Sequence, residues 1–380
     1  MIEVVKVFYN SEIVGKLAIK NKKIYFEYDR HFLTLKLELS PFKLPLKANV
    51  IESTDLVFDS LFGVFNDSLP DGWGRLLVDR YLRKCNMTNI SPLDRLSCIG
   101  PNGGIGALTY EPILENPLKY KVKNLDNIFK KTKTIDEYDD QFLDELRVLN
   151  GSSCGARPKI LTSKYLIKFP SSFDPVDIGA IEYAYNIMAK KAGLDVPKVK
   201  LFPSKLGPGY FGSKRFDIVD NTKIHTHTLS GLIHADHRIP CLDYQDILKV
   251  TGLLTKDKVE CEKLIRLTIF NILSHNRDDH AKNFSYCMQK NGEWKLSPTY
   301  DITFSYGPNG EHCTTICGEG RNPTVKHIHE LVRTSYLNGI NVNIIIEQVK
   351  DALSEWKTIA KKVGVSKKSL TLIKKNLLFS

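Results

Sequence analysis

The first 50 residues alternate between hydrophobic and polar positions, and polar turns at Asn10-Ser11 and Asn21-Lys22 interrupt the alternation. A period of two is typical of strands that bury one face, so the segment predicts antiparallel strands. The period changes in "SLPDGWGRLLVDRYLRK", where Pro70-Asp71-Gly72 predicts a turn and the apolar residues after it share one helical face. The pattern therefore predicts a small sheet followed by a helix.

Further along the chain, "EYDDQFLDELRVL" and "DIGAIEYAYNIMAKKAGL" have the spacing of amphipathic helices, and "KILTSKYLIKFP" reads as two strands. From residue 243 onward the pattern is mostly helical, apart from a predicted hairpin around Lys290-Asn291-Gly292. Strands mixed with single helices early and helices late indicate an α+β protein of two lobes. The expected divisions are 1–112, 113–215 and 216–380.

The composition of the chain indicates in which cellular compartment the protein works and whether it has a membrane partner. No apolar run approaches the roughly 20 residues that a membrane span needs, and "MIEVVKVFYNSEIVG" does not have the plan of a signal peptide. We therefore expect a cytoplasmic protein without a membrane partner. The eight cysteines include no CxxC pair, so we expect buried free thiols in a reducing compartment, including Cys313 and Cys317 beside His312.

The formal net charge of +11 favours anionic partners such as a nucleotide, a nucleic acid or an acidic protein. The lysines and arginines are spread along the chain in short clusters, and no DNA-reading motif is visible. Direct, sequence-specific binding of DNA by this chain alone is therefore not expected.

The segment "HNRDDHAKNF" carries the densest set of reactive side chains. Asp278 and Asn283 are separated as in the R-D-x-x-x-x-N loop of protein kinases, where the aspartate accepts a hydroxyl proton and the asparagine holds Mg²⁺. Two predicted strands follow, and Asp301 comes after them in "TYDIT", where a kinase has its second metal-binding acid. Mg²⁺ prefers oxygen ligands, which Asn283 and Asp301 supply.

A kinase also needs a cation for the phosphates and an acid that holds this cation. Lys168 lies in the apolar predicted strand "YLIKFP", and Glu182 follows in the next predicted helix. The preceding loop from Gly151 to Arg157 has the composition to cover phosphates with backbone N–H groups. A lysine in a strand is more often an edge residue, but these features in this order are much less common together.

The sequence resembles the HipA-type serine/threonine kinases, the toxin halves of bacterial toxin–antitoxin pairs. The resemblance covers nearly the whole chain. Its motifs are "LKLELSPFKLPL", "SLPDGWGRLLVDRYL", "IGPNGGIGALTYEP", "SSCGARPKI", "YLIKFP", "AGLDVP", "KRFD", "NRDDHAKNFS" and "LSPTYDIT". The last two are specific in combination.

The resemblance implies roles for individual residues, with ATP and Mg²⁺ as cofactors. Asp278 would be the catalytic base, Asn283 and Asp301 the Mg²⁺ ligands, and Lys168 a phosphate contact. Ser152, or else Ser153, would be autophosphorylated in the glycine-rich loop, which brings a charge of about −2 close to ATP and is expected to inactivate the protein. The further expected ATP contacts are Ser153, Cys154, Gly155, Ala156, Lys214, Arg215 and Phe216, the last three as the hinge. The expected supporting residues are Glu182, His280 and Arg277.

Two departures from the kinase pattern leave questions open. The usual His-Arg-Asp is Asn276-Arg277-Asp278 here, and Asp279 adds a second candidate carboxylate. Asp278 is preferred because only it has the five-residue separation from Asn283. The loop also contains Arg157-Pro158, which weakens the inference of autophosphorylation more than that of ATP binding.

The resemblance also implies partners. These are a helix-turn-helix antitoxin similar to HipB, operator DNA reached through it, and a protein substrate, typically an aminoacyl-tRNA synthetase. The segment 1–112 has no nucleotide-binding constellation, so we expect it to be a scaffold or a docking domain.

Several other readings compete with a protein kinase. The histidines of "HTHTLSGLIHADH" (His225, His227, His234 and His237) are candidate zinc ligands of a metallohydrolase, with the first two on one strand face. The favoured interpretation is that these histidines line the entrance of the helical lobe or lie on its surface. The glycine-rich "IGPNGGIGALTY" is a further phosphate-loop candidate, although a tight loop is favoured there. A pseudokinase kept for its partner surface, or a lipid kinase, is the remaining alternative.

Overall fold

The computed structural model describes the chain except for residues 55, 100–103, 115–121, 123, 134–139, 152–154, 156, 336, 338, 379 and 380. The chain forms two compact units, each assembled from separate segments. The first unit contains residues 1–173, 215–234 and 287–293. The second contains residues 174–214, 235–286 and 294–380. The division at about residues 112 and 215 stays a prediction.

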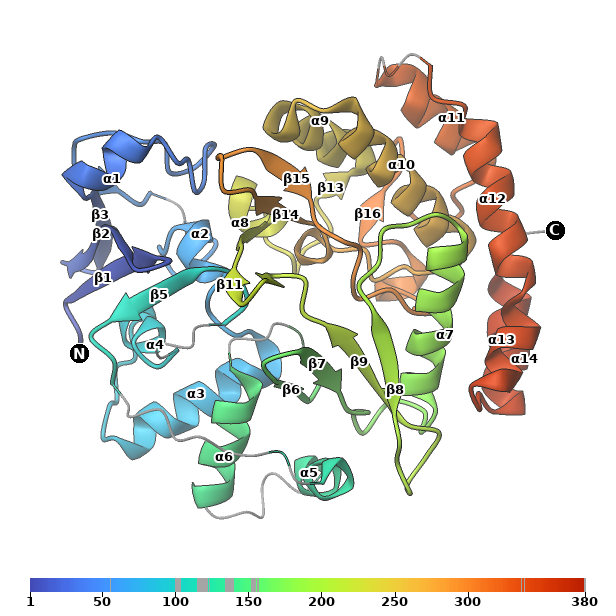
Figure 1. The fold of residues 1–380 in the computed structure, drawn as a ribbon, viewed down its shortest axis with the longest axis horizontal. Coiled ribbons are helices and arrows are strands. Elements are labelled where there is room, and N and C mark those ends of the chain that lie inside the picture. Colours follow the sequence, from blue (N-terminus) through green and yellow to red (C-terminus); the bar gives the residue numbers. More distant parts are fainter. Residues whose placement is uncertain are drawn as a thin grey trace. The chain divides into compact units, whose positions relative to one another are not determined.

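The N-terminal part of the first unit is a five-stranded antiparallel sheet with the order β4-β3-β2-β1-β5 (Figure 1). Its strands are β1 (Val4–Tyr9), β2 (Glu12–Lys20), β3 (Lys23–Tyr28), β4 (Ile51–Glu52) and β5 (Leu108–Glu111). Val5, Val7 and Leu17 are among its buried side chains, and polar residues alternate with them. The strands predicted up to Tyr28 are therefore confirmed.

The predicted strands between residues 30 and 50 are wrong. Residues Arg30–Leu35 form the helix α1, which begins because the Asp29 carboxylate accepts a hydrogen bond of 2.8 Å from the N–H of His31. The helix ends at Lys36, whose backbone is left-handed with φ 54°. The alternation of apolar and polar residues continued through this segment, but the cap decided its local structure.

The remainder of the first unit is mixed. Its helices are α2 (Gly63–Asn66), α3 (Gly72–Lys84), α4 (Pro92–Leu96), α5 (Leu125–Thr132), α6 (Asp140–Asn150) and α8 (Leu229–Ile233). Its short strands are β6 (Lys159–Leu161), β7 (Tyr165–Lys168), β10 (Ile218–Val219), β11 (Thr222–Lys223) and β12 (His225–Thr228). The helix predicted from "GWGRLLVDRYLRK" is confirmed as α3. The described part of the helix predicted from "EYDDQFLDELRVL" is confirmed as α6.

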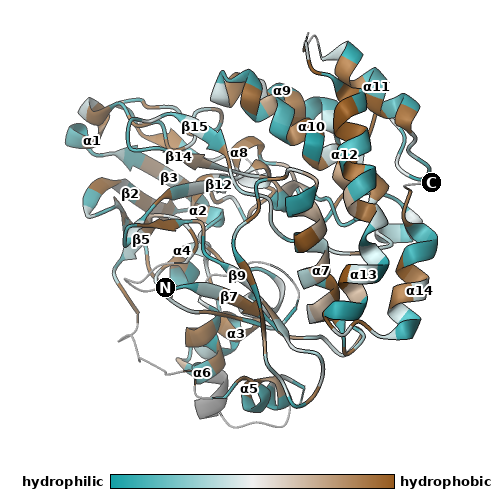
Figure 2. Cartoon of the chain, turned by 45° about the vertical axis from the view of Figure 1, so that its right-hand side comes forward, coloured by the Kyte–Doolittle hydropathy of each residue, from teal (hydrophilic) through white to brown (hydrophobic). Residues whose placement is uncertain are grey.

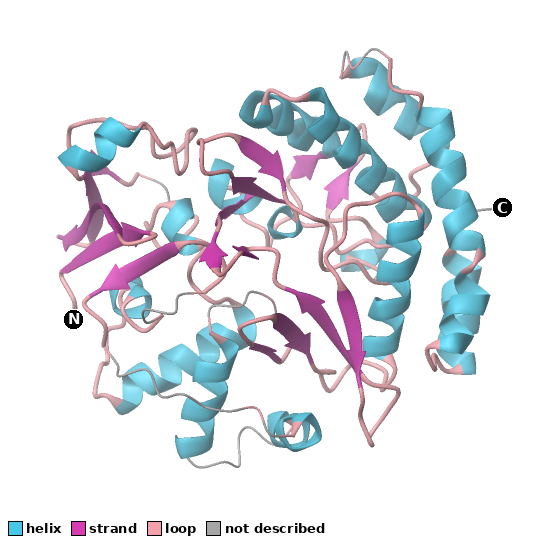
Figure 3. Cartoon of the chain, viewed as in Figure 1, coloured by secondary structure: helices cyan, strands magenta, loops and turns pink. Residues whose placement is uncertain are grey.

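The second unit is mainly helical (Figure 3). Its helices are α7 (Ile178–Lys191), α9 (Tyr244–Thr255), α10 (Lys258–Leu273), α11 (Val325–Thr334), α12 (Val342–Ser354), α13 (Trp356–Lys362) and α14 (Lys367–Asn376). Its strands include β8 (Val199–Phe202), β9 (Tyr210–Lys214), β13 (Leu242–Asp243), β15 (Trp294–Leu296) and β16 (Thr314–Thr315). Both the helical character after residue 243 and the amphipathic helix at 178–191 were correctly predicted.

Aromatic side chains fill the core between the helices of the second unit. Tyr185 on α7 makes edge contacts with Phe270 of α10 and Trp356 of α13, at centroid distances of 6.4 and 5.7 Å. The Tyr185 hydroxyl donates to the carbonyl oxygen of Ser274 at 2.7 Å, so the core also fixes the end of α10. The same helices carry polar residues on their outer faces (Figure 2).

The strand β14 (Ser285–Met288) leads into the predicted hairpin turn, in which the N–H of Gln289 donates to Glu293 at 2.7 Å. The hairpin prediction is therefore confirmed. Among the described residues, no helix is long and apolar enough to cross a membrane.

Candidate active site

The loop that follows α10 is fixed by its own polar residues. The Asn276 side chain donates to the Asn271 side chain at 2.9 Å, and its backbone N–H donates to the Asn271 carbonyl at the same distance. His275 has a left-handed backbone (φ 58°), and its Nδ1 lies 3.1 Å from the carbonyl oxygen of Ser305. The chain therefore leaves the helix in a defined direction.

The two adjacent acids of this loop have opposite environments. The side chain of Asp278 is 46 % exposed, whereas that of Asp279 is 0 % exposed. One acid therefore reaches the surface of the loop while the next is buried beneath it. Only Asp278 is accessible to a substrate.

The buried carboxylate of Asp279 is an anchor for the surrounding chain. It accepts hydrogen bonds from the Tyr244 hydroxyl (2.7 Å) and His312 Nδ1 (2.8 Å). The backbone N–H groups of Cys313 and Thr314 donate to its other oxygen at 2.9 and 3.3 Å. Burial, together with Asp279, raises the pKa of Tyr244 well above its ordinary value, so this hydroxyl stays a donor. His312 is thus committed to Asp279.

A short 3-10 helix, Ala281–Asn283, follows the acids. His280 caps it, since its Nδ1 accepts from the N–H of Lys282 at 3.2 Å, and its Nε2 lies 3.9 Å from Oδ1 of Asp278. The Asn283 side chain donates through Nδ2 to the backbone oxygen of Asp278 at 2.6 Å. That bond commits the amide nitrogen and leaves the amide oxygen, the atom that a hard cation prefers.

The segment with Asp301 is tied to this loop. The Tyr300 hydroxyl donates to the carbonyl oxygen of Lys282 at 2.6 Å, next to Asn283. Further on, the N–H of Ser305 donates to the carbonyl of His275 at 3.1 Å. Asp301 itself has a left-handed backbone, with φ 56°. The structure thus holds the segments of the two predicted Mg²⁺ ligands against each other.

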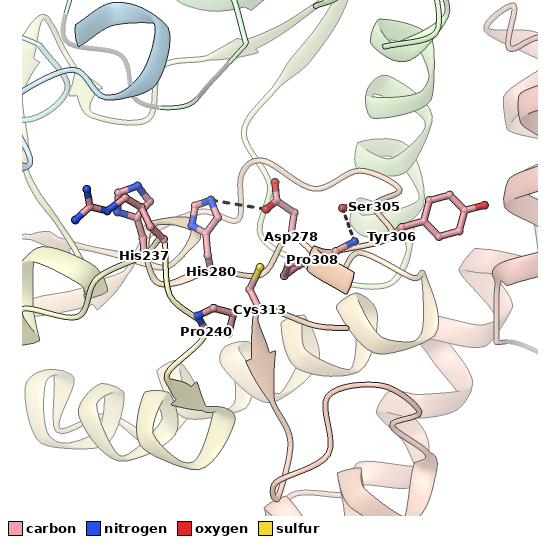
Figure 4. A pocket seen from close by; sticks show the side chains of 10 residues that line it. His237, Pro240, Asp278, His280, Ser305, Tyr306, Pro308 and Cys313 are labelled. Atoms are coloured by element: carbon pink, nitrogen blue, oxygen red, sulfur yellow. Dashed lines mark hydrogen bonds and ion pairs between the residues drawn. The ribbon is translucent and has the colours of Figure 1, made fainter. Parts of the chain in front are cut away.

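A pocket of about 480 Å³ opens beside Asp278 (Figure 4). Its lining residues are His237, Arg238, Pro240, Asp278, His280, Ser305, Tyr306, Gly307, Pro308 and Cys313. Asp278 and His280 point toward each other there, and Cys313 lies beside them. Burial, with the nearby Asp279 and Asp278 charges, raises the pKa of Cys313 to about 12, so its thiol is not a nucleophile at neutral pH.

Arg277, expected as a supporting residue, links the loop that carries Asp278 to the segment of residues 310–321. Its guanidinium donates to the carbonyl oxygens of Gly310 and, at 2.9 Å, of Arg321. The sequence did not predict these two partners.

The first unit holds the predicted phosphate cation. Lys168 is the last residue of β7 and lies directly opposite Lys159 of β6 in the antiparallel register. Sequence reasoning missed Lys159 as a second cation. This lysine is only 4 % exposed, and its Nζ lies beside Gly155. The signal was the hairpin register, because cross-strand partners project from the same face. The predicted loop residues Ser152, Ser153, Cys154 and Ala156 lie outside the described residues.

The other predicted nucleotide residues have structural partners of their own. Arg215 forms two bonds with Asp217, of 3.0 and 2.6 Å, and donates to Gly104 at 3.0 Å. Asp217 in turn accepts from the N–H of Gly106, which explains the close approach of the glycine-rich segment around residue 104. Lys214 ends β9, and the boundary between the two units falls directly after it.

Glu182 and Phe216 complete the set. Glu182 is buried on α7 of the second unit, whereas Lys168 belongs to the first, so the predicted ion pair between them stays a prediction. Phe216 follows Arg215 in the first unit and is partly buried.

Two of the four candidate zinc histidines, His225 and His227, are part of the interior, whereas His234 and His237 are partly exposed and His237 lines the pocket. His225 and His227 share one face of β12, as predicted, but their exposures are 1 % and 0 %, so the expected position at an entrance or surface is wrong for them. His225 Nε2 lies 2.9 Å from the Leu39 carbonyl, and His234 Nε2 accepts from the N–H of Gly63 at 3.0 Å. Within the described part of the chain, no group of three or more His, Cys, Asp or Glu residues is arranged to hold a metal.

Seven of the eight cysteines lie in described residues, and all seven are free. Cys98, Cys261 and Cys287 are buried as expected, and Cys313 and Cys317 are only partly buried. Cys85 and Cys241 are exposed, so the prediction of burial is wrong for these two.

Comparison with known families decides the relationship. The HipA N-terminal domain matches residues 5–111, and the HipA-like C-terminal domain matches residues 151–363, more than half of the chain. The chain belongs to the HipA-like family.

A solved structure supports the same fold. The chain is similar to a protein in the complex of the toxin–antitoxin system HipA, HipB and operator DNA from Shewanella oneidensis MR-1, with TM-score 0.72 and 14% identity. The match covers 98% of this chain and 96% of that chain. The kinase CtkA of Helicobacter pylori gives a TM-score of 0.36 and 15% identity over 60% of this chain and 90% of that chain. The match to the Shewanella protein shows that the chain has the predicted two-lobed, kinase-like α+β fold.

Among curated proteins, the chain is 26% identical over 151 residues to Y4dM of Sinorhizobium fredii (strain NBRC 101917 / NGR234), which is named as a candidate kinase. The match spans 36% of this chain and 36% of that relative.

Proposed function

We propose that this protein is an ATP-dependent serine/threonine protein kinase of the HipA type and the toxin of a toxin–antitoxin module. The observation that carries the proposal is the contrast between Asp278 and Asp279 in the loop of a HipA-like chain. The Asp278 carboxylate is accessible beside a pocket, whereas the Asp279 carboxylate is buried and accepts four hydrogen bonds. A general base must reach its substrate, so Asp278 is the candidate for this role.

The phosphoryl transfer needs positioning and charge compensation more than covalent chemistry. Asp278 would orient a serine or threonine hydroxyl and accept its proton. Lys168 would contact the nucleotide phosphates, with Lys159 opposite it as a second cation. Lys214, Arg215 and Phe216 would border the adenine, and Glu182 would hold Lys168.

The residues around Asn283 fit a magnesium ion. Asn283 and Asp301 offer an amide oxygen and a carboxylate from two segments that hydrogen bonds hold together, and hard cations prefer oxygen ligands. Bound Mg²⁺ would neutralise charge on the ATP phosphates. The described residues give the alternative zinc reading no support.

The family relationship guides the proposed partners. A HipB-like helix-turn-helix antitoxin would bind the chain and bring it to operator DNA, as in the complex of HipA, HipB and operator DNA from Shewanella oneidensis. A translation protein such as an aminoacyl-tRNA synthetase is the proposed substrate, and Ser152 or Ser153 the proposed autophosphorylation site. Copurification with a coexpressed antitoxin and phosphopeptide mapping after induction test these two points.

Transfer of labelled γ-phosphate from Mg-ATP tests the activity itself. We compare the wild type with Asp278→Gln and use Glu262→Gln, an exposed change on α10 that precedes the loop, as the matched control. Loss of label with Asp278→Gln and its retention with Glu262→Gln would support the kinase. Undiminished transfer by Asp278→Gln, or no transfer by a wild type that contains stoichiometric zinc, would contradict it.

A further inference from the structure

Helix α3 of the N-terminal HipA domain lies antiparallel along α6, the helix that leads into the glycine-rich loop (Figure 1). Near the far end of α3, Lys84 Nζ lies 3.4 Å from Oδ2 of Asp144. One turn earlier, the Arg147 guanidinium stacks 4.0 Å from the ring centre of Tyr81. As residue numbers fall along α3, they rise along α6, so the start of α3 meets the end of α6.

At that meeting point the two helices are in close contact. A Cβ atom added to Gly74 would lie 2.3 Å from Nδ2 of Asn150, so a larger residue there would force the Asn150 side chain to move. Asn150 is buried, and its amide donates to the carbonyl oxygen of Gly151 at 3.1 Å. The beginning of the glycine-rich loop therefore rests on α3.

A second contact reaches further into the loop. Asp71 is the N-cap residue of α3, yet its side chain makes no capping bond to its own helix. Instead its Oδ1 accepts a hydrogen bond from the N–H of Gly155. An aspartate at this position usually satisfies its own helix, so the direction of this carboxylate indicates a role toward the loop.

The charge balance at this point allows a carboxylate close to a phosphate site. The Lys159 Nζ lies beside the same glycine, since a Cβ added to Gly155 would lie 2.4 Å from it. The Lys159 ammonium group and the Asp71 carboxylate thus both lie close to Gly155, so a cation accompanies the carboxylate at this point of the loop. The contact with Asp71 can therefore order the loop without making the site negative.

We propose that Asp71 is a positioning residue for ATP, and that α3 makes the N-terminal HipA domain a working part of the nucleotide site. The inference rests on the proposed function, and it replaces the expected scaffold role of segment 1–112. Asp71 acts through the backbone of Gly155 and does not touch the reacting atoms. A partner that displaces α3 would consequently weaken ATP binding.

Calorimetric titration of the full chain with Mg-ATP tests this proposal, together with kcat and KM for ATP. Asp71→Ala should raise both Kd and KM about tenfold, because a charge-assisted hydrogen bond is lost, and should lower kcat at saturating ATP less than threefold. Asp71→Asn keeps an acceptor oxygen and should restore most of the affinity. Asp79→Asn is the matched control, since Asp79 lies on the same helix but pairs with Arg95 at 2.8 Å.

Hydrogen exchange of the peptide 151–161 without nucleotide gives a readout that does not depend on kinase activity. Exchange should be faster in Asp71→Ala than in the wild type and unchanged in Asp79→Asn. Unchanged affinity and exchange in Asp71→Ala would overturn the proposal, and tighter ATP binding would also overturn it by showing that the carboxylate competes with phosphate. A wild type that binds no Mg-ATP, while exchange still depends on Asp71, would overturn the proposed function and leave the contact itself supported.

Discussion

The Nδ1 atom of His227 lies 2.6 Å from Oδ2 of Asp67, and both side chains are buried in the first unit. The two residues are 160 positions apart, in the matched N-terminal and C-terminal HipA domains respectively. Asp67 also accepts from the N–H and the hydroxyl of Thr228, each at 2.7 Å. Parts of both family domains are thus joined in one compact unit by a buried polar network.

The network has the order of a hydrolase triad, because Ser40 Oγ lies 3.0 Å from His227 Nε2. The exposures of Ser40 and His227 are only 1 % and 0 %, however, so no substrate can reach the hydroxyl in this conformation. The arrangement therefore serves stability, because each buried polar group has its partner.

Asp67→Ala should destabilise the protein by about 3–5 kcal/mol, because it leaves the buried His227 donor and the partly buried Thr228 donors without their acceptor. Asp67→Asn keeps one acceptor and should cost less. The urea dependence of tyrosine and tryptophan fluorescence measures the effect. Asp59→Ala is the control: Asp59 pairs with Arg75 at an exposed site, and its loss should cost about 1 kcal/mol or less. Equal unfolding midpoints for the two alanine variants would contradict the network's role.

His225 makes stability depend on pH. Burial, together with the neighbouring His227, lowers the pKa of His225 to about 4, whereas an unfolded histidine titrates near 6.5. The unfolded chain therefore binds the additional proton between these values. This contribution is fully present above pH 6.5 and is lost as pH falls toward 4, by up to about 3 kcal/mol.

Substitution of His225 tests that dependence. His225→Asn should flatten the fall in the free energy of unfolding between pH 6.5 and 4, as measured by urea titrations at several pH values. Other groups titrate in the same range, so the difference between the wild type and the variant isolates the histidine. Parallel pH curves for the two proteins would show that His225 is not the cause.

The sequence predicted the helices and the reactive loop better than their surroundings. Alternation placed His225 and His227 on one face of a strand, but the atoms that bury them come from Leu39, Ser40 and Asp67, far away in the chain. The roles of Asp278 and Asn283 were likewise predicted from their spacing within one short segment of the sequence. The role of Asp279 was not, because three of its four donors come from residues 312–314 and the fourth is Tyr244.

The lysines Lys159 and Lys168 stand opposite each other in the β6–β7 hairpin, where like charges oppose pairing. Cross-strand partners project from the same face of a hairpin, so a phosphate bound at that face would contact both ammonium groups. Lys159→Met and Lys168→Met should each weaken Mg-ATP binding about tenfold or more, without a loss of thermal stability. Lys164→Met in the exposed hairpin turn is the matched control and should bind as the wild type does. If Lys159→Met also binds ATP normally, Lys159 has only a structural role.

The neighbours Asp278 and Asp279 should separate activity from stability. Asp278→Asn removes a half-exposed carboxylate, so the melting temperature should stay within a few degrees, while phosphoryl transfer falls by about 10²–10⁴-fold because the general base is lost. Asp279→Ala leaves the hydrogen-bond donors of Tyr244 and His312 without an acceptor, so it should destabilise the protein by several kcal/mol.

Thermal melting and single-turnover phosphoryl transfer on the same preparations distinguish the two acids. Asp279→Asn retains one acceptor oxygen, so it should fold better than Asp279→Ala and keep more activity than Asp278→Asn. The reverse order of activity, with a stable and inactive Asp279→Asn beside an active Asp278→Asn, would assign the base to Asp279. In that case the loop would have to change its conformation during catalysis, because four hydrogen-bond donors enclose the Asp279 carboxylate in this conformation.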